Sequence, residues 1–203
     1  MPDAPRICLA SASPRRRELL AQLGVAHRVV PADIDETRRE GEAAADYVLR
    51  MALEKARRVA ADPQASQGLP VLGADTSVVI GGEVLGKPAD AAQSRRMLDL
   101  LGGRTHEVLS AVALVDARGA RSRLSRTEVR FRRVSPAEAE AYWHSGEPRD
   151  KAGGYAIQGL AAAFVESIAG SYSGVVGLPL FETAQLLESV GIAPWRAPAR
   201  EGA

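Results

Sequence analysis

The sequence predicts an α/β or α+β fold in which helices flank a mixed, twisted sheet. Short apolar runs that indicate strands alternate with segments of helical periodicity, which favours a sheet covered by helices. Several neighbouring runs are joined by glycine turns typical of hairpins, so we expect antiparallel as well as parallel strand pairs. The 203 residues suffice for one domain, or for one domain with an added lobe.

The first third of the chain predicts two strands and two helices. The apolar run 6–10 indicates a short buried strand. Residues 14–23 place three leucines on one helical face, and a glycine then ends that helix. Residues 26–31 predict a second strand, which precedes an acidic stretch that we expect to be a loop. Residues 43–61 have helical spacing, with Val48, Met51, Ala52, Lys55 and Val59 close to one stripe, which predicts a long amphipathic helix.

The middle of the chain predicts a hairpin, a helix and two longer strands. Residues 69–80 and 83–85 are apolar runs separated by two glycines, the arrangement of a tight β-hairpin. Residues 90–101 predict a helix that ends at a pair of glycines. Residues 106–115 and 121–134 predict an apolar strand and a long return strand joined by a turn.

The last third mixes short elements with a polar loop. A serine, a proline and a glutamate within residues 135–138 open a helix with a good N-cap. Residues 146–154 are polar and rich in glycine, which predicts a loop. Residues 155–158 and 164–168 predict two further strands, and residues 180–191 predict the last helix.

The composition is ordinary for a soluble globular protein, with 46% hydrophobic and 25% charged residues. The net charge of +1 gives no global field for nucleic acid, so any basic site must be local. The single cysteine, Cys8, lies in an apolar run and is expected to be a buried thiol of the core. No signal peptide or membrane span is visible, and we expect a cytoplasmic protein.

The predicted helix 14–23 begins with an unusual cluster of arginines. Ser13 suits its N-cap, and a proline suits its first position. The free N–H groups of a helix start carry partial positive charge, so cations there lower stability unless an anion lies among them. A phosphate is the expected anion, which makes Arg15 and Arg16 candidate ligands. The alternative is a solvated basic turn.

Asp75 stands inside an apolar run, where a carboxylate is costly unless it is paired or binds a metal. The alternative is a carboxylate satisfied by backbone N–H groups at a bulge that Gly73 permits. The hairpin register places Thr76 opposite Lys87, so a carboxylate, a hydroxyl and an ammonium are expected at its open end. Asp75 and Thr76 serve one site only if the strand bends, because successive side chains alternate faces.

Two further segments are weaker candidates for a site. The acidic group Asp33, Asp35 and Glu36 offers oxygen ligands for Mg²⁺ or Mn²⁺, although an acidic surface loop is the simpler interpretation. Residues 145–159 combine charges with glycines, which is typical of a loop that approaches a ligand. Gln158 in that segment presents both a donor and an acceptor to a nucleobase.

Several familiar motifs are missing from the sequence. It has no P-loop, no dinucleotide-binding Gly-x-Gly-x-x-Gly, no nucleophile elbow, and no zinc spacing among its three histidines. Residues 121–133 are rich in arginine, but their pattern indicates the solvent-facing side of a strand more readily than a nucleic-acid platform. We therefore expect neither nucleic acid nor a membrane among the partners.

Six short motifs together resemble the Maf family of nucleoside triphosphate pyrophosphatases. They occur in order over nearly the whole chain, and they are specific in combination. The motifs are Leu9-Ala10-Ser11-Ala12-Ser13-Pro14-Arg15-Arg16, Gly73-Ala74-Asp75-Thr76, Gly86-Lys87-Pro88, Asp150-Lys151-Ala152-Gly153, Ile157-Gln158-Gly159 and Gly177-Leu178-Pro179.

The resemblance implies hydrolysis of a nucleoside triphosphate to the monophosphate and pyrophosphate, with a divalent metal cation, Mg²⁺ or Mn²⁺, as cofactor. It also implies a homodimer and an elongated α/β fold with a mixed twisted sheet, shared with inosine triphosphate pyrophosphatases. The form of the motif at Gln158 looks like the branch that acts on dTTP and UTP, whereas a sister branch prefers 7-methyl-GTP. Residues 1–193 are then a single catalytic domain with two lobes around a central cleft, and residues 194–203 a flexible tail.

The same resemblance suggests roles for individual residues. Asp75 is the expected catalytic proton acceptor, and Asp75 and Glu36 are the expected metal ligands. Arg15, Thr76 and Gln158 match positions that the family links to substrate choice. The expected substrate-binding residues are Ser11, Ser13, Arg15, Arg16, Lys55, Thr76, Lys87, Lys151 and Gln158.

Two other functions agree with parts of the sequence. One is a nucleotide-binding regulator, for example of cell division, that has no turnover. A buried carboxylate beside a lysine and a threonine favours an enzyme, because phosphate binding alone gains nothing from a carboxylate. The other is a nucleic-acid binder built on residues 121–133, which predicts tight, salt-dependent binding to oligonucleotides.

Overall fold

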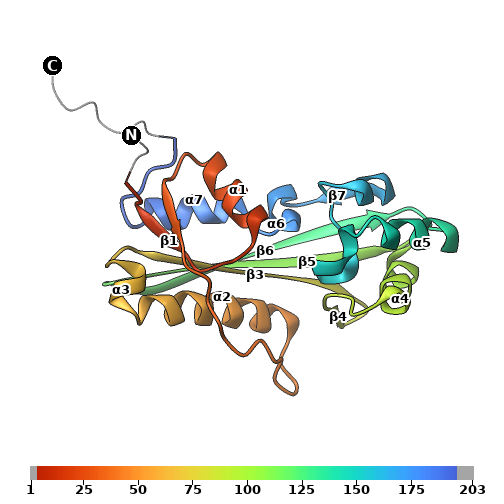
Figure 1. The fold of residues 1–203 in the computed structure, drawn as a ribbon, viewed down its shortest axis with the longest axis horizontal. Coiled ribbons are helices and arrows are strands. Elements are labelled where there is room, and N and C mark those ends of the chain that lie inside the picture. Colours follow the sequence, from red (N-terminus) through yellow and green to blue (C-terminus); the bar gives the residue numbers. More distant parts are fainter. Residues whose placement is uncertain (1–3, 196–203) are drawn as a thin grey trace. The chain divides into compact units, whose positions relative to one another are not determined.

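The computed structural model describes residues 4–195 (Figure 1). The strands are β1 (Ile7–Leu9), β2 (His27–Val29), β3 (Val71–Ile80), β4 (Glu83–Leu85), β5 (Thr105–Asp116), β6 (Gly119–Phe131) and β7 (Val165–Ala169). The α-helices are α1 (Pro14–Gln22), α2 (Ala44–Ala60), α3 (Pro63–Ser66), α4 (Ala91–Leu101), α5 (Pro136–His144), α6 (Tyr172–Val176) and α7 (Leu180–Glu188). Short 3₁₀-helices are η1 (Glu147–Asp150), η2 (Ala152–Gly154) and η3 (Leu160–Phe164).

The strands of the described residues form one mixed sheet. Their order is β2-β1-β3-β5-β6-β7, and β4 pairs with β3 beside this path. β1 runs parallel to β2 and to β3, whereas the pairs β3–β4 and β6–β7 are antiparallel. The predicted α/β fold with a mixed sheet and flanking helices is therefore confirmed.

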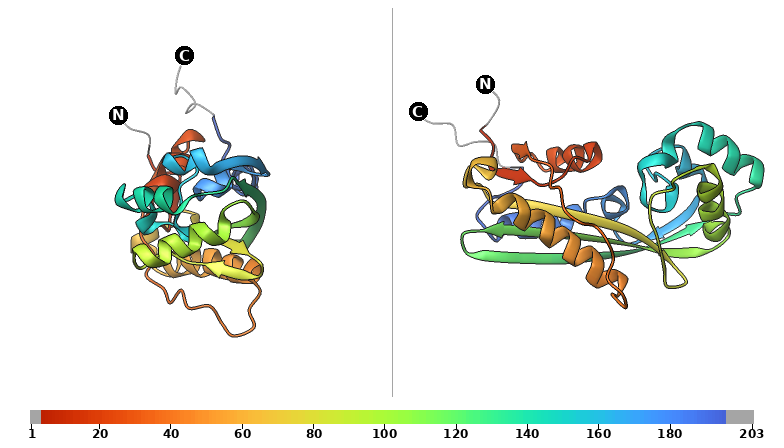
Figure 2. Two further views of the ribbon diagram at one scale, coloured as in Figure 1. Left: turned by 90° about the vertical axis from the view of Figure 1, so that its right-hand side faces the viewer. Right: turned by 60° about the horizontal axis from the view of Figure 1, so that its bottom comes forward.

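The chain forms two compact units. Unit 1 takes the described residues of Met1–Asp75, Ala111–Leu124 and Gly177–Ala203, and unit 2 takes Thr76–Ser110 and Ser125–Val176. Within unit 1, α1 and α7 lie over one side of the strands and α2 lies over the other (Figure 1). Within unit 2, α4 and α5 lie side by side (Figure 2).

The helix α2 packs unusually close to β3 because of a glycine. A Cβ on Gly73 would lie only 2.2 Å from the carbonyl oxygen of Ala52 and 2.8 Å from the backbone nitrogen of Ala56. Gly73 therefore serves a close approach of two backbones. The buried stripe of α2 follows the predicted helical spacing and consists of Val48, Met51, Ala52, Lys55, Ala56 and Val59.

The core of unit 2 is built around aromatic side chains. Phe131 packs edge-on against His106 and Tyr155, with ring centroids 5.0 and 4.9 Å apart. Tyr142 of α5 packs in the same way against Phe164, at 5.4 Å between centroids. Such edge-to-face pairs contribute free energy of stabilisation in addition to that from the apolar area they bury. The cluster anchors both ends of the segment that runs from η2 to β7.

The buried His106 makes the stability of the protein depend on pH. His106 is 3% exposed, its Nε2 lies 2.9 Å from the Tyr155 hydroxyl, and burial lowers its pKa to about 4. The unfolded chain binds this proton already near its ordinary pKa of 6.5, so the free energy of unfolding falls as the pH drops between these values. We expect His106 to contribute a loss of about 3 kcal/mol across this window.

Urea denaturation at about pH 7 and about pH 4 measures this loss. His106→Gln cannot titrate, so its stability should fall distinctly less than that of the wild type over the same interval. Equal losses in the two proteins would show that His106 has no part in the pH dependence.

The β3–β4 hairpin keeps the predicted register only at its closed end. The ladder extends to Val78, opposite Leu85, and stops there. The predicted pairing of Thr76 with Lys87 is wrong. Beyond the ladder, the carbonyl of Gly86 accepts a hydrogen bond from a backbone N–H of η2, 2.9 Å away, so a third segment takes the place of further pairing.

Residues 155–158, predicted as a strand, form a turn. The Ala156 N–H donates to the Tyr142 hydroxyl at 3.1 Å, and the Leu160 N–H donates to the Glu147 carboxylate at 3.0 Å. The side chain of Tyr142 thus meets the backbone inside the segment, and that of Glu147 meets the backbone just after it. The loop predicted at 146–154 contains η1 and η2, and the strand predicted at 164–168 is β7.

The structure confirms the expected thiol of the core. Cys8 is a buried free thiol. The Trp195 N–H donates to the Leu23 carbonyl at 2.9 Å, and the remainder of the predicted flexible tail, 196–203, lies outside the described residues. Among the described helices, none has the length and apolar character that crossing a membrane would require.

Candidate functional site

The first turn of α1 holds the Arg16 guanidinium in a fixed place. Ser13 caps the helix by accepting a hydrogen bond from the Arg16 N–H at 3.4 Å, and the turn contains no acidic residue. The Nε of Arg16 donates to the Gly177 carbonyl at 2.9 Å, and its Nη1 donates to the Ser11 hydroxyl at 3.4 Å. Ser11 therefore contacts the Arg16 guanidinium, whereas Ser13 caps the backbone of the same residue.

The structure gives a physical role to the motif Gly177-Leu178-Pro179. Gly177 has a φ of 135°, a backbone conformation that side chains other than glycine rarely adopt. In this conformation its carbonyl becomes the acceptor for Arg16. The motif before α7 thus orients a side chain on α1, a link that no sequence pattern indicates.

Charges of both signs surround Arg16. Burial lowers the pKa of the Arg16 guanidinium, the charge of Asp75 opposes that shift, Arg15 adds to it, and Glu36 opposes it. Arginine stays protonated in proteins, so Arg16 remains a cation beside two carboxylates and a second arginine. Arg17, by contrast, is exposed.

Lys55 joins the two carboxylates that were predicted as metal ligands. Its Nζ lies 2.8 Å from Asp75 Oδ1 and 2.8 Å from Glu36 Oε1. Lys55 and Asp75 are 7% and 8% exposed, so the ammonium offsets the cost of burying the carboxylate. The structure thus brings together three predicted residues from α2, β3 and the loop that precedes α2.

The donor set of Asp75 and Glu36 fits a divalent cation. Both are carboxylates, the oxygen ligands that Mg²⁺ prefers, and both approach the same Lys55 nitrogen. Mg²⁺ is commonly held by one or two carboxylates together with substrate phosphates rather than by a protein cage. Over residues 4–195, no group of three or more His, Cys, Asp or Glu side chains is placed to hold a metal ion.

Tyr47 belongs to the same cluster, although the sequence analysis missed it. Its hydroxyl donates to the Glu36 carbonyl at 2.9 Å. Burial, followed by the charges of Asp75 and Glu36, raises the pKa of Tyr47 to about 12. Its signal in the sequence was its spacing of eight residues before Lys55, which places both on one face of α2.

Thr76 has a defined partner in unit 2. Its Oγ1 lies 3.0 Å from the Ser110 hydroxyl, which donates its own hydrogen to the Gly174 carbonyl at 2.6 Å. A serine has only one hydroxyl hydrogen, so Thr76 is the donor in its bond with Ser110. Ser110 was not predicted, because nothing in its apolar strand pattern marks it.

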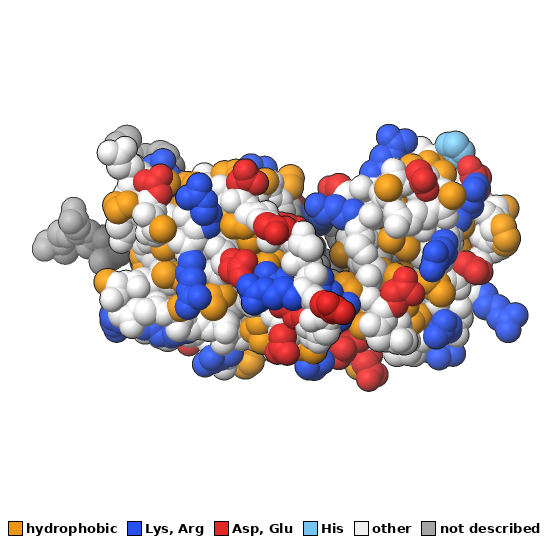
Figure 3. Space-filling model, turned by 90° about the horizontal axis from the view of Figure 1, so that it is seen from below, with side chains coloured by type: hydrophobic (Ala, Val, Ile, Leu, Met, Phe, Trp, Pro, Cys, Tyr) orange, Lys and Arg blue, Asp and Glu red, His pale blue; other side chains and the backbone are white. Residues whose placement is uncertain are grey.

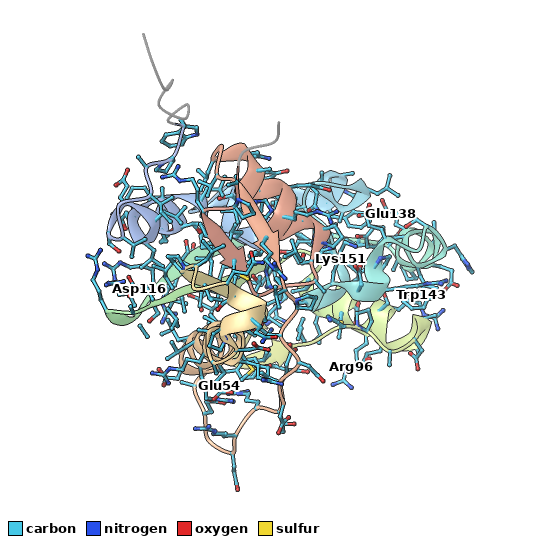
Figure 4. All side chains as sticks on the ribbon, turned by 60° about the vertical axis from the view of Figure 1, so that its left-hand side comes forward. Glu54, Arg96, Asp116, Glu138, Trp143 and Lys151 are labelled. Carbon is cyan, nitrogen blue, oxygen red and sulfur yellow. The ribbon has the colours of Figure 1, made fainter. Side chains whose placement is uncertain are left out.

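The remaining predicted residues lie on neighbouring segments of unit 2. Lys87 and Gln158 are exposed; Lys87 lies shortly after β4, and Gln158 lies in a turn. The Nζ of Lys151 donates to the Glu147 carbonyl at 2.8 Å and pairs with Asp150 at 2.6 Å. Figure 4 labels Lys151, which stands between η1 and η2. Glu147, which the sequence analysis passed over, is hydrogen bonded to several of these elements.

Two arginines of β6 are paired with acidic residues of unit 2. Arg126 lies 3.1 Å from Glu107, and Arg130 lies 2.6 Å from Glu166. On the face shown in Figure 3, basic and acidic side chains are interspersed. These contacts agree with the predicted solvent-facing side of a strand.

A family model and several curated proteins match nearly the whole chain. The model described as Maf-like protein covers residues 6–190. The dTTP/UTP pyrophosphatase of Hahella chejuensis is 54% identical over 194 residues, which is 96% of each chain. That of Anaeromyxobacter dehalogenans is 56% identical over 200 residues, 96% of this chain and 100% of its own.

Among solved structures, the Staphylococcus aureus Ham1 protein aligns with 61% of this chain and 70% of its own, with a TM-score of 0.43 and 14% identity. The dTTP/UTP pyrophosphatase of Bordetella parapertussis is 56% identical over 197 residues, 94% of this chain and 95% of its own. The range matched by the family model contains all six motifs quoted above. We conclude that the chain belongs to the Maf family.

Proposed function

We propose that this protein is a nucleoside triphosphate pyrophosphatase that hydrolyses dTTP and UTP to the monophosphate and pyrophosphate. The observation that carries the proposal is the buried Asp75 carboxylate, paired with Lys55 and interacting with Arg16, in a chain 54–56% identical to proteins named dTTP/UTP pyrophosphatase. A protein that only bound phosphate would gain nothing from this carboxylate. The cluster therefore supports an enzyme over a nucleotide-binding regulator of cell division.

In the proposed reaction, the oxygen of a water molecule attacks the α-phosphorus. The bond from that phosphorus to the oxygen bridging to the β-phosphorus breaks, pyrophosphate leaves, and Asp75 accepts the proton of the water. Arg15 and Arg16 neutralise charge on the phosphate oxygens. The bonds from Arg16 to Gly177 and Ser11 hold the guanidinium before substrate arrives, which reduces the cost of ordering it.

We propose Asp75 and Glu36 as the ligands of the divalent cation, Mg²⁺ or Mn²⁺. When bound, such a cation supplies positive charge to the phosphate oxygens. Lys55 contacts both carboxylates and so keeps them directed toward one place. Their chemistry and their convergence support this assignment.

We assign the nucleoside contacts to Gln158 and Thr76, and the remaining phosphate contacts to Lys87 and Lys151. Gln158 carries a donor and an acceptor suited to the edge of a pyrimidine. We assign Thr76 to the selection of the nucleotide as well. Lys87 and Lys151 add positive charge for the phosphates. The family resemblance further supports a cytoplasmic homodimer that removes unwanted nucleotides.

Pyrophosphate release from a panel of nucleotides tests the proposed function. The panel contains dTTP, UTP, CTP, GTP and 7-methyl-GTP, each with Mg²⁺, with Mn²⁺ and with a chelator. We expect the highest kcat/KM for dTTP and UTP, and loss of release in the chelator. A preference for 7-methyl-GTP would instead support the sister branch, and no release from any triphosphate would support the regulator.

A further inference from the structure

The carboxylate of Glu147 organises the turn that carries Gln158. It accepts three hydrogen bonds: from the Tyr142 hydroxyl at 2.7 Å and the Ala161 N–H at 3.3 Å on Oε1, and from the Leu160 N–H at 3.0 Å on Oε2. Two of these donors are backbone groups just after Gln158. The first backbone N–H groups of η3 are therefore hydrogen bonded to a side chain of η1.

The same carboxylate explains the glycine beside Gln158. A Cβ on Gly159 would lie 2.1 Å from Glu147 Oε2, a distance at which no side chain fits without moving the carboxylate. The Gly159 N–H also donates to the Ala156 carbonyl at 3.0 Å, which closes the turn. Gly159 thus lets the backbone lie directly against Glu147.

Tyr142 extends the support to the other side of Gln158. Its hydroxyl accepts a hydrogen bond from the Ala156 N–H at 3.1 Å while it donates to Glu147. Burial and the bond to Glu147 raise the pKa of Tyr142, so the hydroxyl stays protonated and remains a donor. Backbone groups both before and after Gln158 are therefore tied to one Tyr142–Glu147 pair.

Glu147 also holds a second predicted ligand-binding residue. Its backbone carbonyl accepts the hydrogen bond from Lys151 Nζ at 2.8 Å. One residue thus supports Gln158 through its side chain and Lys151 through its main chain. Both supports lie within unit 2.

Glu147 is itself an unsuitable ligand for the triphosphate. Both oxygens of its carboxylate already accept hydrogen bonds, and an ionised carboxylate repels phosphate. Burial works against ionisation of Glu147, but the hydrogen bonds from Tyr142, Leu160 and Ala161 outweigh it and lower its pKa. Glu147 therefore supports Gln158 and Lys151, and it is not itself a ligand-binding residue.

We propose that Glu147 is a positioning residue that sets the choice of nucleobase by fixing the Gln158 turn together with Lys151. The proposal rests on the proposed function, because it assumes that Gln158 meets the pyrimidine. It concerns a residue that acts through Gln158, so its removal should change which nucleotide is preferred more than the rate of bond cleavage.

The substitution Glu147→Gln isolates the carboxylate at nearly constant volume. A glutamine has one acceptor oxygen and one amide nitrogen that only donates. If the oxygen faces Tyr142 and Ala161, the amide meets the Leu160 N–H, and if it is flipped, the amide meets the Ala161 N–H. Either orientation sets a donor against a donor, so the turn loses at least one bond.

Steady-state kinetics of the full-length protein with UTP and with CTP test the proposal. For Glu147→Gln we expect the ratio of kcat/KM for UTP to that for CTP to fall about 10-fold or more, mainly through a higher KM for UTP. The matched control is Glu166→Gln, which makes the same chemical change at an exposed ion pair with Arg130 and should keep the wild-type ratio. Tyr142→Phe removes one donor to Glu147 and should shift the ratio in the same direction.

Two results would overturn the proposal. One is an unchanged UTP-to-CTP ratio in Glu147→Gln, including the case in which kcat falls equally for both nucleotides, and the other is a ratio that falls through kcat for UTP alone, with KM unchanged. In a Gln158→Ala background, Glu147→Gln should have no further effect on the ratio, and a full additional effect would also contradict the role.

Amide hydrogen exchange separates this proposal from the proposed function. If the wild type hydrolyses neither nucleotide, the proposed function fails, and exchange at Gly159, Leu160 and Ala161 decides the positioning role. Faster exchange in Glu147→Gln than in Glu166→Gln supports Glu147 as the support of the turn. Equal exchange in the two variants overturns it.

Discussion

Asp75→Asn is expected to lower kcat for dTTP and UTP by about 10²–10⁴-fold, the usual contribution of a general base. An asparagine keeps the size of the side chain and can still accept a hydrogen bond from Lys55 Nζ through its amide oxygen. It cannot take the proton of the attacking water, and it is a poorer ligand for a divalent cation. The loss should therefore appear in kcat, with a smaller change in KM.

Asp116→Asn is the matched control for this loss. Asp116, labelled in Figure 4, also belongs to unit 1 and pairs with Arg121 at 3.3 Å, and the side chains of Asp75 and Asp116 are equally exposed, at 11%. Any change in stability from neutralising a buried aspartate should thus be shared, while the fall in kcat should not. Thermal melting of both variants verifies folding, and a near wild-type kcat in Asp75→Asn would remove Asp75 from the mechanism.

The parts of the site that depend on local rules could be predicted from the sequence. Capping chemistry identified Ser13 and the start of α1, and the anomaly of a carboxylate in an apolar strand identified Asp75. The helical stripe of α2 placed Lys55 on the buried face. These rules need only spacing and residue type, and each prediction of this kind is confirmed as a statement about local structure.

The parts that depend on contacts between distant segments could not be predicted. Gly177 supports Arg16 across 161 positions of the chain, and no periodicity reveals such a link. The strand predicted at 155–158 was wrong: the Tyr142 hydroxyl accepts the Ala156 N–H, and Glu147 holds the backbone directly after the segment. The predicted pairing of Thr76 with Lys87 was also wrong. The strand ladder ends at Leu85, and the next carbonyl, that of Gly86, bonds to the distant Gly153 N–H.

Glu36 was the weakest candidate in the sequence, and the structure adds most to the argument for it. Taken alone, Glu36 was one acidic residue in a surface loop, and a solvated loop was the simpler interpretation. Its contact with Lys55 joins that loop to Asp75, and the hydroxyl of Tyr47 fixes its backbone. A candidate of this kind is identified by its contacts with Lys55 and, through Lys55, with Asp75, and spacing along the chain does not reveal such contacts.

Lys55→Met is expected to destabilise the protein by about 3 kcal/mol, because it leaves the buried carboxylate of Asp75 without its cation. Glu36 is half exposed and can turn to water, so most of the penalty arises at Asp75. The methionine fills the space of the lysine stem, which limits any loss from packing. Urea denaturation at neutral pH measures the change in the free energy of unfolding.

The double variant Lys55→Met/Asp75→Asn tests whether charge is the cause. With both charges removed, the buried site holds a thioether and an amide, and the free energy of unfolding should recover to well above that of Lys55→Met alone. Lys87→Met, at an exposed lysine, should change stability by less than about 0.5 kcal/mol. If the single losses simply add in the double variant, the pair is not energetically coupled. Recovery would instead show that Lys55 is retained to hold Asp75 ionised and in place, so the same contact that stabilises unit 1 also prepares the proposed proton acceptor.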